Sequence, residues 1–251
     1  MKVRYYSSFS DDFTQSANQN FSLPDDYVWV RKDIFLKLLS NLIYGIAVIF
    51  GGIYCKLFLH AKIRGRKSLR GITGDFFIFG NHTQPFGDVI LPALCVLPKR
   101  IYTVVSTANY GIPIIGKILP FLGGLPVVNS LHGMKELTKA IGIRIENRHP
   151  VVIYPEAHVW EYYTKIRPFP DTAFKFPVKF SKPAFAMTVT YKKSKLFKRP
   201  LAEVFIDGPF YAKGDTIVEK TADLHGKVLS AMQERSKNSD FSYIEYKKSE
   251  P

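Results

Sequence analysis

Cysteine is scarce in this chain of 251 residues, which contains only Cys55 and Cys95. Both lie among apolar residues, and neither has the closely spaced Cys or His neighbours of a zinc site. The scarcity excludes a disulfide framework, and we expect two reduced thiols without a chemical role in a cytoplasmic compartment. We also expect no secretory signal, because the first residues are polar and no apolar stretch precedes a small-residue cleavage site.

Acidic residues are too few to balance the basic ones. The chain has 35 Lys and Arg against 21 Asp and Glu, a formal net charge of +14. Residues 56–74 and 172–200 hold six and eight basic residues without one acid. Such patches attract phosphate on nucleic acid, lipid head groups or substrates. A merely solvated basic surface is the alternative, but an apolar segment beside the first patch favours phosphate at a membrane.

Charged residues are absent from residues 38–55, which Lys37 and Lys56 bracket. As a helix this segment is roughly 27 Å long at 1.5 Å per residue, near the minimum for crossing a bilayer. We therefore expect a membrane-associated helix over residues 35–60 that lies in one leaflet, on the cytoplasmic face of the cell membrane. A single membrane span is the main competing interpretation, and a buried helix of a soluble domain is the third.

Between residues 61 and 240, short apolar runs alternate with segments of helical spacing, which predicts an α/β fold. We expect a single domain with a mixed, largely parallel sheet flanked by helices. The predicted strands are Phe76–Phe79, Ile101–Val105, Leu125–Val128, Val151–Tyr154, Ala184–Tyr191 and Ala202–Ile206. The predicted helices are Asp88–Leu97, 131–147 and 217–236. Residues 1–34 form a polar N-terminal segment and residues 241–251 a polar tail. Within the first we expect residues 1–26 to be mobile, and we expect residues 237–251 to be frayed.

Two short motifs follow predicted strands. Asn81-His82 precedes Asp88 in the first, and Tyr154-Pro155-Glu156-Ala157-His158 forms the second. Ligands in α/β sheets bind beyond the carboxyl ends of the strands, so both motifs can share one crevice. A histidine oriented by a carboxylate is suited to removing a proton from a hydroxyl. Because no Gly-x-Ser-x-Gly motif occurs, direct attack by the acceptor hydroxyl is favoured over an acyl-enzyme.

At these residues the chain resembles the glycerolipid acyltransferases of the lysophosphatidate acyltransferase type. That family pairs Asn-His-x-x-x-x-Asp with Phe-Pro-Glu-Gly-Thr-Arg about seventy residues later, and the resemblance covers about residues 60–210. It implies a 1-acylglycerol-3-phosphate O-acyltransferase-like enzyme of phospholipid biosynthesis. Such an enzyme moves a fatty acyl chain from acyl-CoA or acyl carrier protein to a lysophospholipid hydroxyl, with no cofactor or metal. The resemblance makes His82 the base, Asp88 its partner, and Asn81 and Glu156 residues of the acceptor site.

The chain departs from the family pattern at several positions. Five residues rather than four separate His82 from Asp88, so the loop must bulge to bring them together. The segment 123–130 lacks the family's phosphate-binding arginine, and Ala157, His158 and Val159 replace Gly, Thr and Arg. Lys165 and Arg167 are candidates to take over the phosphate contact, since ammonium and guanidinium groups both bind phosphate. We therefore expect His158, Lys165 and Arg167 in the substrate site, unless the acceptor has no phosphate.

Three other functions remain open at this stage. The departures motivate a non-catalytic lipid-binding protein of the same fold. His82, Asp88, Glu156 and His158 could instead form a metal site, although no His-x-x-x-His spacing supports it. Aromatic residues from Trp160 to Phe169 could stack on nucleic acid, but an interfacial belt or acyl-chain groove is favoured. The expected partners are membrane lipids, an acyl donor and a lysolipid acceptor, without nucleic acid.

Overall fold

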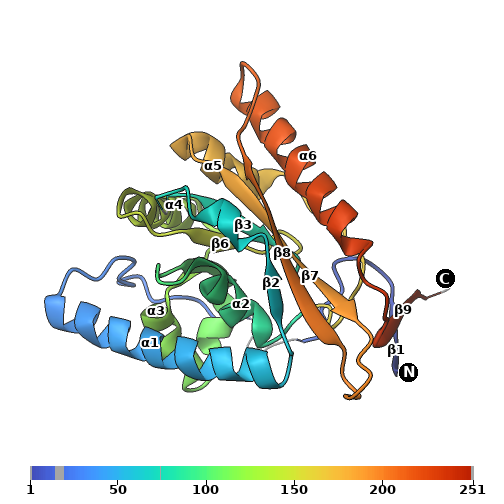
Figure 1. The fold of residues 1–251 in the computed structure, drawn as a ribbon. Coiled ribbons are helices and arrows are strands. Elements are labelled where there is room, and N and C mark those ends of the chain that lie inside the picture. The colour runs from blue at the N-terminus through green and yellow to red at the C-terminus, as the bar shows by residue number, and fades with distance from the viewer. Residues whose placement is uncertain (1, 15–19, 74, 250–251) are drawn as a thin grey trace.

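A seven-stranded sheet forms the centre of the structure, a computed structural model that describes residues 2–14, 20–73 and 75–249 (Figure 1). The strand order is β2-β8-β7-β3-β6-β4-β5. These strands are β2 (Lys62–Arg64), β3 (Phe77–Gly80), β4 (Tyr102–Ser106), β5 (Gly124–Val127), β6 (Val151–Ile153), β7 (Ala184–Lys192) and β8 (Leu201–Phe210). All neighbours pair in parallel except β7 and β8. The expected mixed, largely parallel sheet is confirmed.

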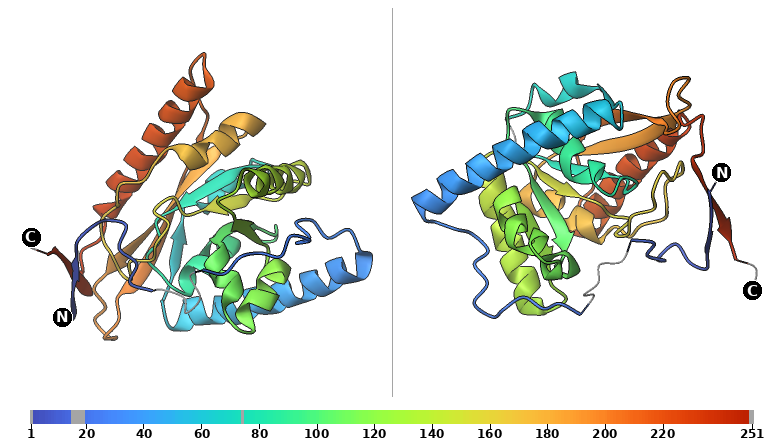
Figure 2. Two further views of the ribbon diagram at one scale, coloured as in Figure 1. Left: turned by 180° about the vertical axis from the view of Figure 1, so that it is seen from behind. Right: turned by 90° about the horizontal axis from the view of Figure 1, so that it is seen from below.

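Helices cover both faces of this sheet (Figures 1 and 2). One face carries α1 (Ile34–Leu57), α2 (Gly87–Val96) and α3 (Ile115–Leu122). The other carries α4 (Leu131–Glu146), α5 (Lys175–Phe180) and α6 (Ile217–Ser236). Short 3-10 turns occur at Arg66–Leu69, Thr107–Gly111 and Thr172–Phe174. Each predicted strand and helix is present, with its ends displaced by a few residues.

The alternation of side chains along β3 explains why both faces are covered. Phe77 and Phe79 point into the core beneath α4 and α6, whereas Phe76 and Ile78 belong to the core beneath α1 and α2. All four side chains are buried. A strand that is buried on both faces reads as a continuous apolar run, which is typical of parallel sheets between helix layers.

Helix α1 lies along the domain and packs on α2 and α3. Gly51 and Gly52 face Ile90 and Leu94 of α2, and a Cβ atom at Gly51 would lie 2.5 Å from Ile90 Cγ1. Near the other end of α1, the Ser40 hydroxyl donates to the carbonyl oxygen that ends α3, at Phe121 (2.9 Å). These contacts hold α1 against the domain along most of its length.

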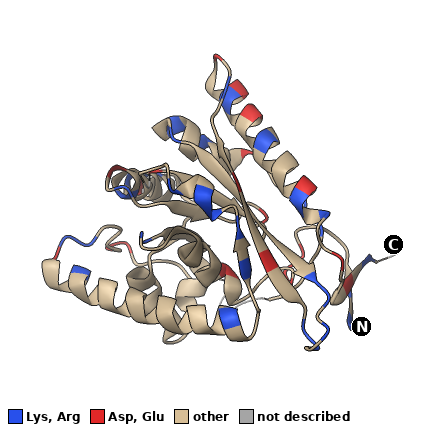
Figure 3. Cartoon of the chain, in the orientation of Figure 1, with Lys and Arg blue, Asp and Glu red and all other residues tan. Residues whose placement is uncertain are grey.

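The outer face of α1 is apolar and open to solvent. Apart from Lys37 and Lys56 near its two ends, the helix carries no charge (Figure 3). The exposed apolar residues are Ile34, Phe35, Leu38, Leu42, Ile46, Ile49, Phe50, Ile53 and Leu57. By length and composition, α1 could cross a membrane. The expected apolar N-terminal helix is therefore present.

The two polar ends contain strands that the sequence analysis did not expect. β1 (Lys2–Tyr6) pairs in parallel with β9 (Ile244–Lys248). Around this two-stranded sheet, the rings of Tyr6 and Tyr246 pack against Trp160, whose side chain is fully buried. Aromatic burial thus orders segments that composition alone marks as mobile, and the expectation of mobility is corrected for these strands. Helices α3 and α5 and strand β2 were also not predicted.

Candidate active site

The first motif leaves the sheet at the end of β3, where two contacts fix its path. The Asn81 side chain donates from Nδ2 to the Val189 carbonyl (3.0 Å) and accepts from the Val189 amide through Oδ1 (2.8 Å). Asn81 is buried, so it ties the loop to neighbouring strand β7. Gly80 permits the close approach of Tyr154, whose Cε1 would lie 2.5 Å from a Cβ atom there.

His82 and Asp88 are in hydrogen-bond contact despite the extra residue between them. His82 Nδ1 lies 2.7 Å from Asp88 Oδ2, and the same oxygen accepts from the Gln84 amide (2.8 Å). The Asp88 amide donates to the Gln84 carbonyl (3.0 Å), which forms the turn into α2. The loop therefore absorbs the insertion as a turn at the start of α2.

The environment of this pair favours one arrangement of protons. Burial raises the pKa of Asp88, and the hydrogen bond to His82 acts against that rise. When Asp88 is ionised it only accepts hydrogen bonds, and in that state His82 Nδ1 donates and Nε2 carries the free lone pair. The His82 side chain keeps 21% exposure, whereas that of Asp88 has 1%. The pair thus presents a partly accessible base held by a buried carboxylate.

Two tyrosines that the sequence analysis did not assign hold this loop. The Tyr154 ring stacks on the His82 ring with centroids 4.5 Å apart, and its hydroxyl donates to the Asp88 carbonyl (2.5 Å). The buried Tyr191 hydroxyl contacts Thr83 Oγ1 (2.7 Å) and accepts from Gln84 Nε2 (3.0 Å). Tyr154 could have been identified from its place in the second motif. Tyr191 gives no local signal, because it is more than a hundred residues from the loop.

Glu156 of the second motif contacts the backbone of the first motif. Its Oε2 atom accepts from the His82 amide (3.2 Å) and from Arg167 Nη2 (3.1 Å). Its Oε1 atom accepts from the Arg167 amide (3.0 Å). Burial raises the pKa of Glu156, and the charge of Arg167 acts in the opposite direction. The carboxylate therefore joins both motifs within the protein interior.

Arg167 differs from its expected role as a phosphate ligand. Its side chain is 1% exposed, and its guanidinium donates to Glu156 and to the carbonyls of Phe9 and His158. It also lies over the Trp160 ring, 4.9 Å from the centroid. In this structure Arg167 has no free surface for a phosphate, and Asn81 is equally buried. Both side chains are instead hydrogen-bonded within the protein.

The turn after Glu156 has the geometry that a glycine would favour. Ala157, which stands where the family has Gly, adopts φ +64° in the left-handed region. A residue with a Cβ atom is strained there, by roughly 1 kcal/mol. The turn therefore keeps a glycine-type conformation although the glycine has been replaced.

The remaining predicted substrate residues lie at the surface. His158 Nδ1 is 3.4 Å from Asp12 Oδ2, and its side chain is 38% exposed. Lys165 is exposed and has no charged partner in the part of the chain that the structure describes. The structure thus connects His82, Asp88, Glu156 and Arg167 in one hydrogen-bonded network. Asn81 adjoins this network in the chain but bonds to Val189, and the side chains of His158 and Lys165 lie outside it.

The residues considered for a metal site do not assemble into one. Within residues 2–14, 20–73 and 75–249, no group of three or more His, Cys, Asp or Glu side chains could hold an ion. Glu156 contacts the backbone amide of His82 and the guanidinium of Arg167, and His158 faces Asp12, so neither side chain meets the side chains of His82 and Asp88. The thiols of Cys55 and Cys95 are buried, and burial raises the pKa of Cys55 to about 11.

Fold and geometry together define an α/β domain whose histidine–aspartate loop follows the central strand of a largely parallel sheet. This fold is similar to that of the 1-acyl-sn-glycerophosphate (LPA) acyltransferase PlsC from Thermotoga maritima, with a TM-score of 0.57. The likeness covers 85% of this chain and 87% of that chain at 14% sequence identity. At this identity the likeness shows a shared fold, which confirms the fold that the motifs indicated. No protein-family profile and no curated protein matches the chain.

Proposed function

We propose that this protein is a membrane-associated O-acyltransferase that moves a fatty acyl chain from acyl-CoA or acyl carrier protein to a lysophospholipid hydroxyl. The observation that supports it most is the 2.7 Å contact between His82 Nδ1 and Asp88 Oδ2, which leaves Nε2 free in a partly exposed position. The shared fold with the PlsC acyltransferase adds to this argument. The acceptor class comes from the resemblance of the two motifs.

In the proposed reaction, His82 carries the proton of the acceptor hydroxyl to the departing thiolate. The acceptor hydroxyl oxygen attacks the thioester carbonyl carbon while His82 Nε2 takes the hydroxyl proton. Asp88 then stabilises the imidazolium through the Nδ1 hydrogen bond. When the tetrahedral intermediate collapses, the carbon–sulfur bond breaks and the imidazolium returns the proton to the departing thiolate. An ester forms, one thioester is consumed, and no acyl-enzyme is needed.

An apolar surface leads from α1 to the His82 loop. Phe58 follows the end of α1 and is exposed, and so is Phe86, which directly precedes α2. The ring of Tyr54 contacts both, with centroids 5.4 Å from Phe58 and 6.4 Å from Phe86. A fatty chain that enters from a lipid surface could follow this surface to His82. We infer a monotopic attachment through the outer face of α1, on the cytoplasmic face of the cell membrane, because α1 packs on the domain at both of its halves.

For the acceptor site we propose a division of roles. Asn81, Glu156 and Arg167 position the His82 loop, while exposed cations contact the anionic parts of the substrates. Lys165 remains such a candidate. Arg199 is a second candidate, because it is exposed and its charge is near enough to affect the Tyr162 side chain. Tyr162 in turn contacts the loop, since its amide donates to the Thr83 carbonyl (2.9 Å). Burial raises the pKa of Tyr162, and the Arg199 charge acts against that rise.

The test is thiol release from a long-chain acyl-CoA or acyl carrier protein in the presence of a lysolipid panel, with products identified by mass spectrometry. His82→Ala removes the base and should lower the rate by about 10²- to 10⁴-fold. His132→Ala, an exposed histidine at the start of α4, is the matched control and should keep the wild-type rate. Circular dichroism checks that both variants are folded.

The alternative of a non-catalytic lipid-binding protein makes the opposite prediction. It requires vesicle binding without thiol release from either donor over the whole acceptor panel. Thiol release that is equal in wild type and His82→Ala would remove His82 from the mechanism.

A further inference from the structure

A cavity lies away from the His82 loop, at the amino ends of the parallel strands. Its volume is about 880 Å³, within the usual range for small-molecule sites. It is bounded by α1, by the segment before α1 and by the starts of β4 and β5, at Tyr102 and Gly124. Because β3, β4 and β6 are parallel, residues at their amino ends lie at the edge opposite His82 and Glu156.

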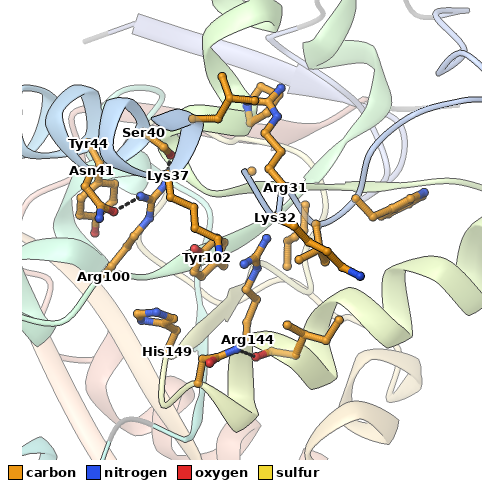
Figure 4. A pocket seen from close by; sticks show the side chains of 18 of the residues that line it. Arg31, Lys32, Lys37, Ser40, Asn41, Tyr44, Arg100, Tyr102, Arg144 and His149 are labelled. Carbon is orange, nitrogen blue, oxygen red and sulfur yellow. Dashed lines mark hydrogen bonds between the residues drawn. The ribbon is translucent and has the colours of Figure 1, made fainter. Parts of the chain in front are cut away.

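Basic side chains surround this cavity, and several extend into it (Figure 4). They include Arg31, Lys32, Lys37, Lys99, Arg100 and Arg144. Among the residues that the structure describes, no Asp or Glu lines the cavity. Burial lowers the pKa of Lys99 and Asp75 acts against this, but Asp75 is already paired with Lys182 at 2.7 Å. The cavity therefore gathers positive charge without its own counter-charge.

Three guanidinium nitrogens of these residues are buried without a hydrogen-bond partner in the described chain. They are Arg31 Nη1, Arg100 Nε and Arg144 Nε. The partners that the guanidinium groups do have are neutral. Arg144 lies over the Tyr102 ring (4.3 Å), and Arg100 donates to Asn41 Oδ1 (2.7 Å) and the Phe121 carbonyl (2.6 Å). Buried cations without an anionic partner are costly, so the charge of an anion in the adjoining cavity would offset this cost.

The basic groups around the cavity also repel one another. Burial lowers the pKa of Arg144, and the neighbouring Arg100 lowers it further. Burial also lowers the pKa of His149 on the cavity wall, and Arg100 and Arg144 add to the effect. Lys37 lies in the first turn of α1, where the helix dipole disfavours a cation. Helix stability therefore does not account for Lys37 at this position.

We propose that this cavity binds the phosphate group of a phosphate ester, and that the head group of an anionic phospholipid supplies it when α1 lies on a membrane. Arg144 and Lys37 extend into the cavity from opposite walls and form the centre of the site (Figure 4). Arginine and lysine at converging positions bind phosphate by paired hydrogen bonds and by point charge. The lipid source follows from α1, whose inner face lines the cavity while its outer face is apolar and exposed.

The experiment measures binding of the full chain to phosphatidylcholine vesicles with and without phosphatidylglycerol or phosphatidate, by flotation at constant ionic strength. The readout is the ratio of affinities for anionic and neutral vesicles, because apolar contacts of α1 contribute to both. Lys37→Gln with Arg144→Gln should lower this ratio about 10- to 30-fold. The matched control is Lys56→Gln with Lys179→Gln, which removes the same charge outside the cavity and should change the ratio less than about threefold.

A second variant guards against misfolding. Lys32→Gln with Lys37→Gln alters two exposed side chains without charged partners in the described residues, and it should lower the ratio in the same direction. A soluble source is tested by thermal shift with inorganic phosphate and glycerol 3-phosphate against sodium chloride of equal ionic strength. One outcome is that these ligands stabilise wild type but not the cavity variant while the two proteins have equal vesicle affinity ratios. In that case the cavity is a phosphate site, and a soluble phosphate ester, not a lipid, occupies it.

The proposal would be overturned if the ratio of affinities for anionic and neutral vesicles, and the thermal shift caused by the phosphate ligands, were the same in wild type, cavity variants and control. The site is independent of acyl transfer, so His82→Ala should keep the wild-type vesicle ratio. The proposal would also be overturned if the control pair lowered the affinity ratio as much as the cavity pair does. The net positive charge of the protein, and not the cavity, would then account for the preference for anionic vesicles.

Discussion

At the scale of single residues, the buried ion pair of Glu156 and Arg167 connects the two motifs. The carboxylate accepts from the His82 amide on one side and from Arg167 on the other. Breaking such a pair leaves an uncompensated charge in the interior, which costs far more than the intact pair contributes. The position of His82 therefore depends on a pair that never touches the substrate in the proposed mechanism.

Arg167→Met should destabilise the fold by about 3–5 kcal/mol at neutral pH, because Glu156 stays buried without its partner. Burial already raises the pKa of Glu156, and removal of Arg167 raises it further. A carboxyl whose pKa is raised on folding favours the folded state below its unfolded pKa, and this contribution is lost as pH rises through the folded value.

The penalty of Arg167→Met should consequently shrink toward about pH 4 and grow toward about pH 7. Urea unfolding of wild type and variant at several pH values measures it. Glu156→Gln with Arg167→Met, which removes both charges, should lose most of this pH dependence. A penalty for the single variant that does not change with pH would contradict the explanation.

The local half of the site could be predicted from the sequence, and the distant half could not. Asn81, His82 and Asp88 lie within eight residues, and the motif order indicated their proximity. The burial of Arg167 against Glu156, Phe9 and Trp160 could not be predicted, because Phe9 and Arg167 are far apart in the sequence and meet only in the folded chain. Tyr191 was missed for the same reason, since β7 brings it beside Thr83 only in the folded sheet.

At the scale of elements, apolar periodicity predicted the strands and helices that fill the core, and it failed for those that depend on pairing. Strand β2 is short and basic, and its position comes from pairing with β8 and from the Arg64–Glu203 contact (2.8 Å). Helix α3 contains Pro120 and Gly116, which sequence rules take as breaks. Gly116 lies against the Tyr110 carbonyl, so tertiary packing overrides its low helix propensity.

The two helical glycines Gly45 and Gly51 test how α1 packs. A Cβ atom at Gly45 would meet nothing within 4 Å, so Gly45→Ala should stabilise the fold by up to about 1 kcal/mol. A Cβ atom at Gly51 would lie 2.5–2.9 Å from three Ile90 atoms, so Gly51→Ala should destabilise it by about 1–2 kcal/mol. Chemical denaturation of both variants measures the difference. Equal effects would mean that α1 is not packed on α2 in solution.

The starts of β3 and β7 are joined by a polar contact with a defined pH response. Lys182 Nζ donates to Asp75 Oδ2 (2.7 Å), and this hydrogen bond, with Thr73, lowers the pKa of Asp75 to about 2. A lowered pKa stabilises the fold above the unfolded value of 3.8, and the contribution is lost as pH falls toward 2. Asp75→Asn should cost less than about 1 kcal/mol at neutral pH, because the pair is partly solvated.

The cost of Asp75→Asn should vanish as the pH of the unfolding measurement falls to about 2. Thermal or urea unfolding across this range gives the comparison with wild type. A cost that persists at the lowest pH would show that the asparagine disturbs packing rather than charge.

At the scale of the whole molecule, one surface combines the exposed apolar stripe of α1 with the loop that carries His82. The stripe and the exposed Phe86 are joined through Tyr54, as described above. In the proposed function, this continuity lets a lipid reach the base without leaving an apolar environment. The basic excess then adds attraction to anionic lipid.

Leu42→Asp with Phe50→Asp places two charges in the outer stripe and should lower vesicle binding by at least about tenfold. The fold should be retained, because both side chains are more than 60% exposed. The matched control is Leu196→Asp, an 87% exposed leucine in the loop between β7 and β8, which should leave binding within about twofold. Flotation measures binding, and circular dichroism measures the fold. Undiminished binding of the double variant would place the membrane contact elsewhere.

The pairing of β1 with β9 also sets an order of events during biosynthesis. Phe9 supplies a carbonyl to Arg167, and Tyr246 stacks on the Trp160 ring that covers this arginine. The ribosome must therefore translate as far as residue 248 before β9 can form and Tyr246 can pack on Trp160 beside Arg167. The apolar outer stripe of α1 is synthesised well before that point. In the proposed function, α1 can therefore contact the bilayer before the His82 loop receives this support.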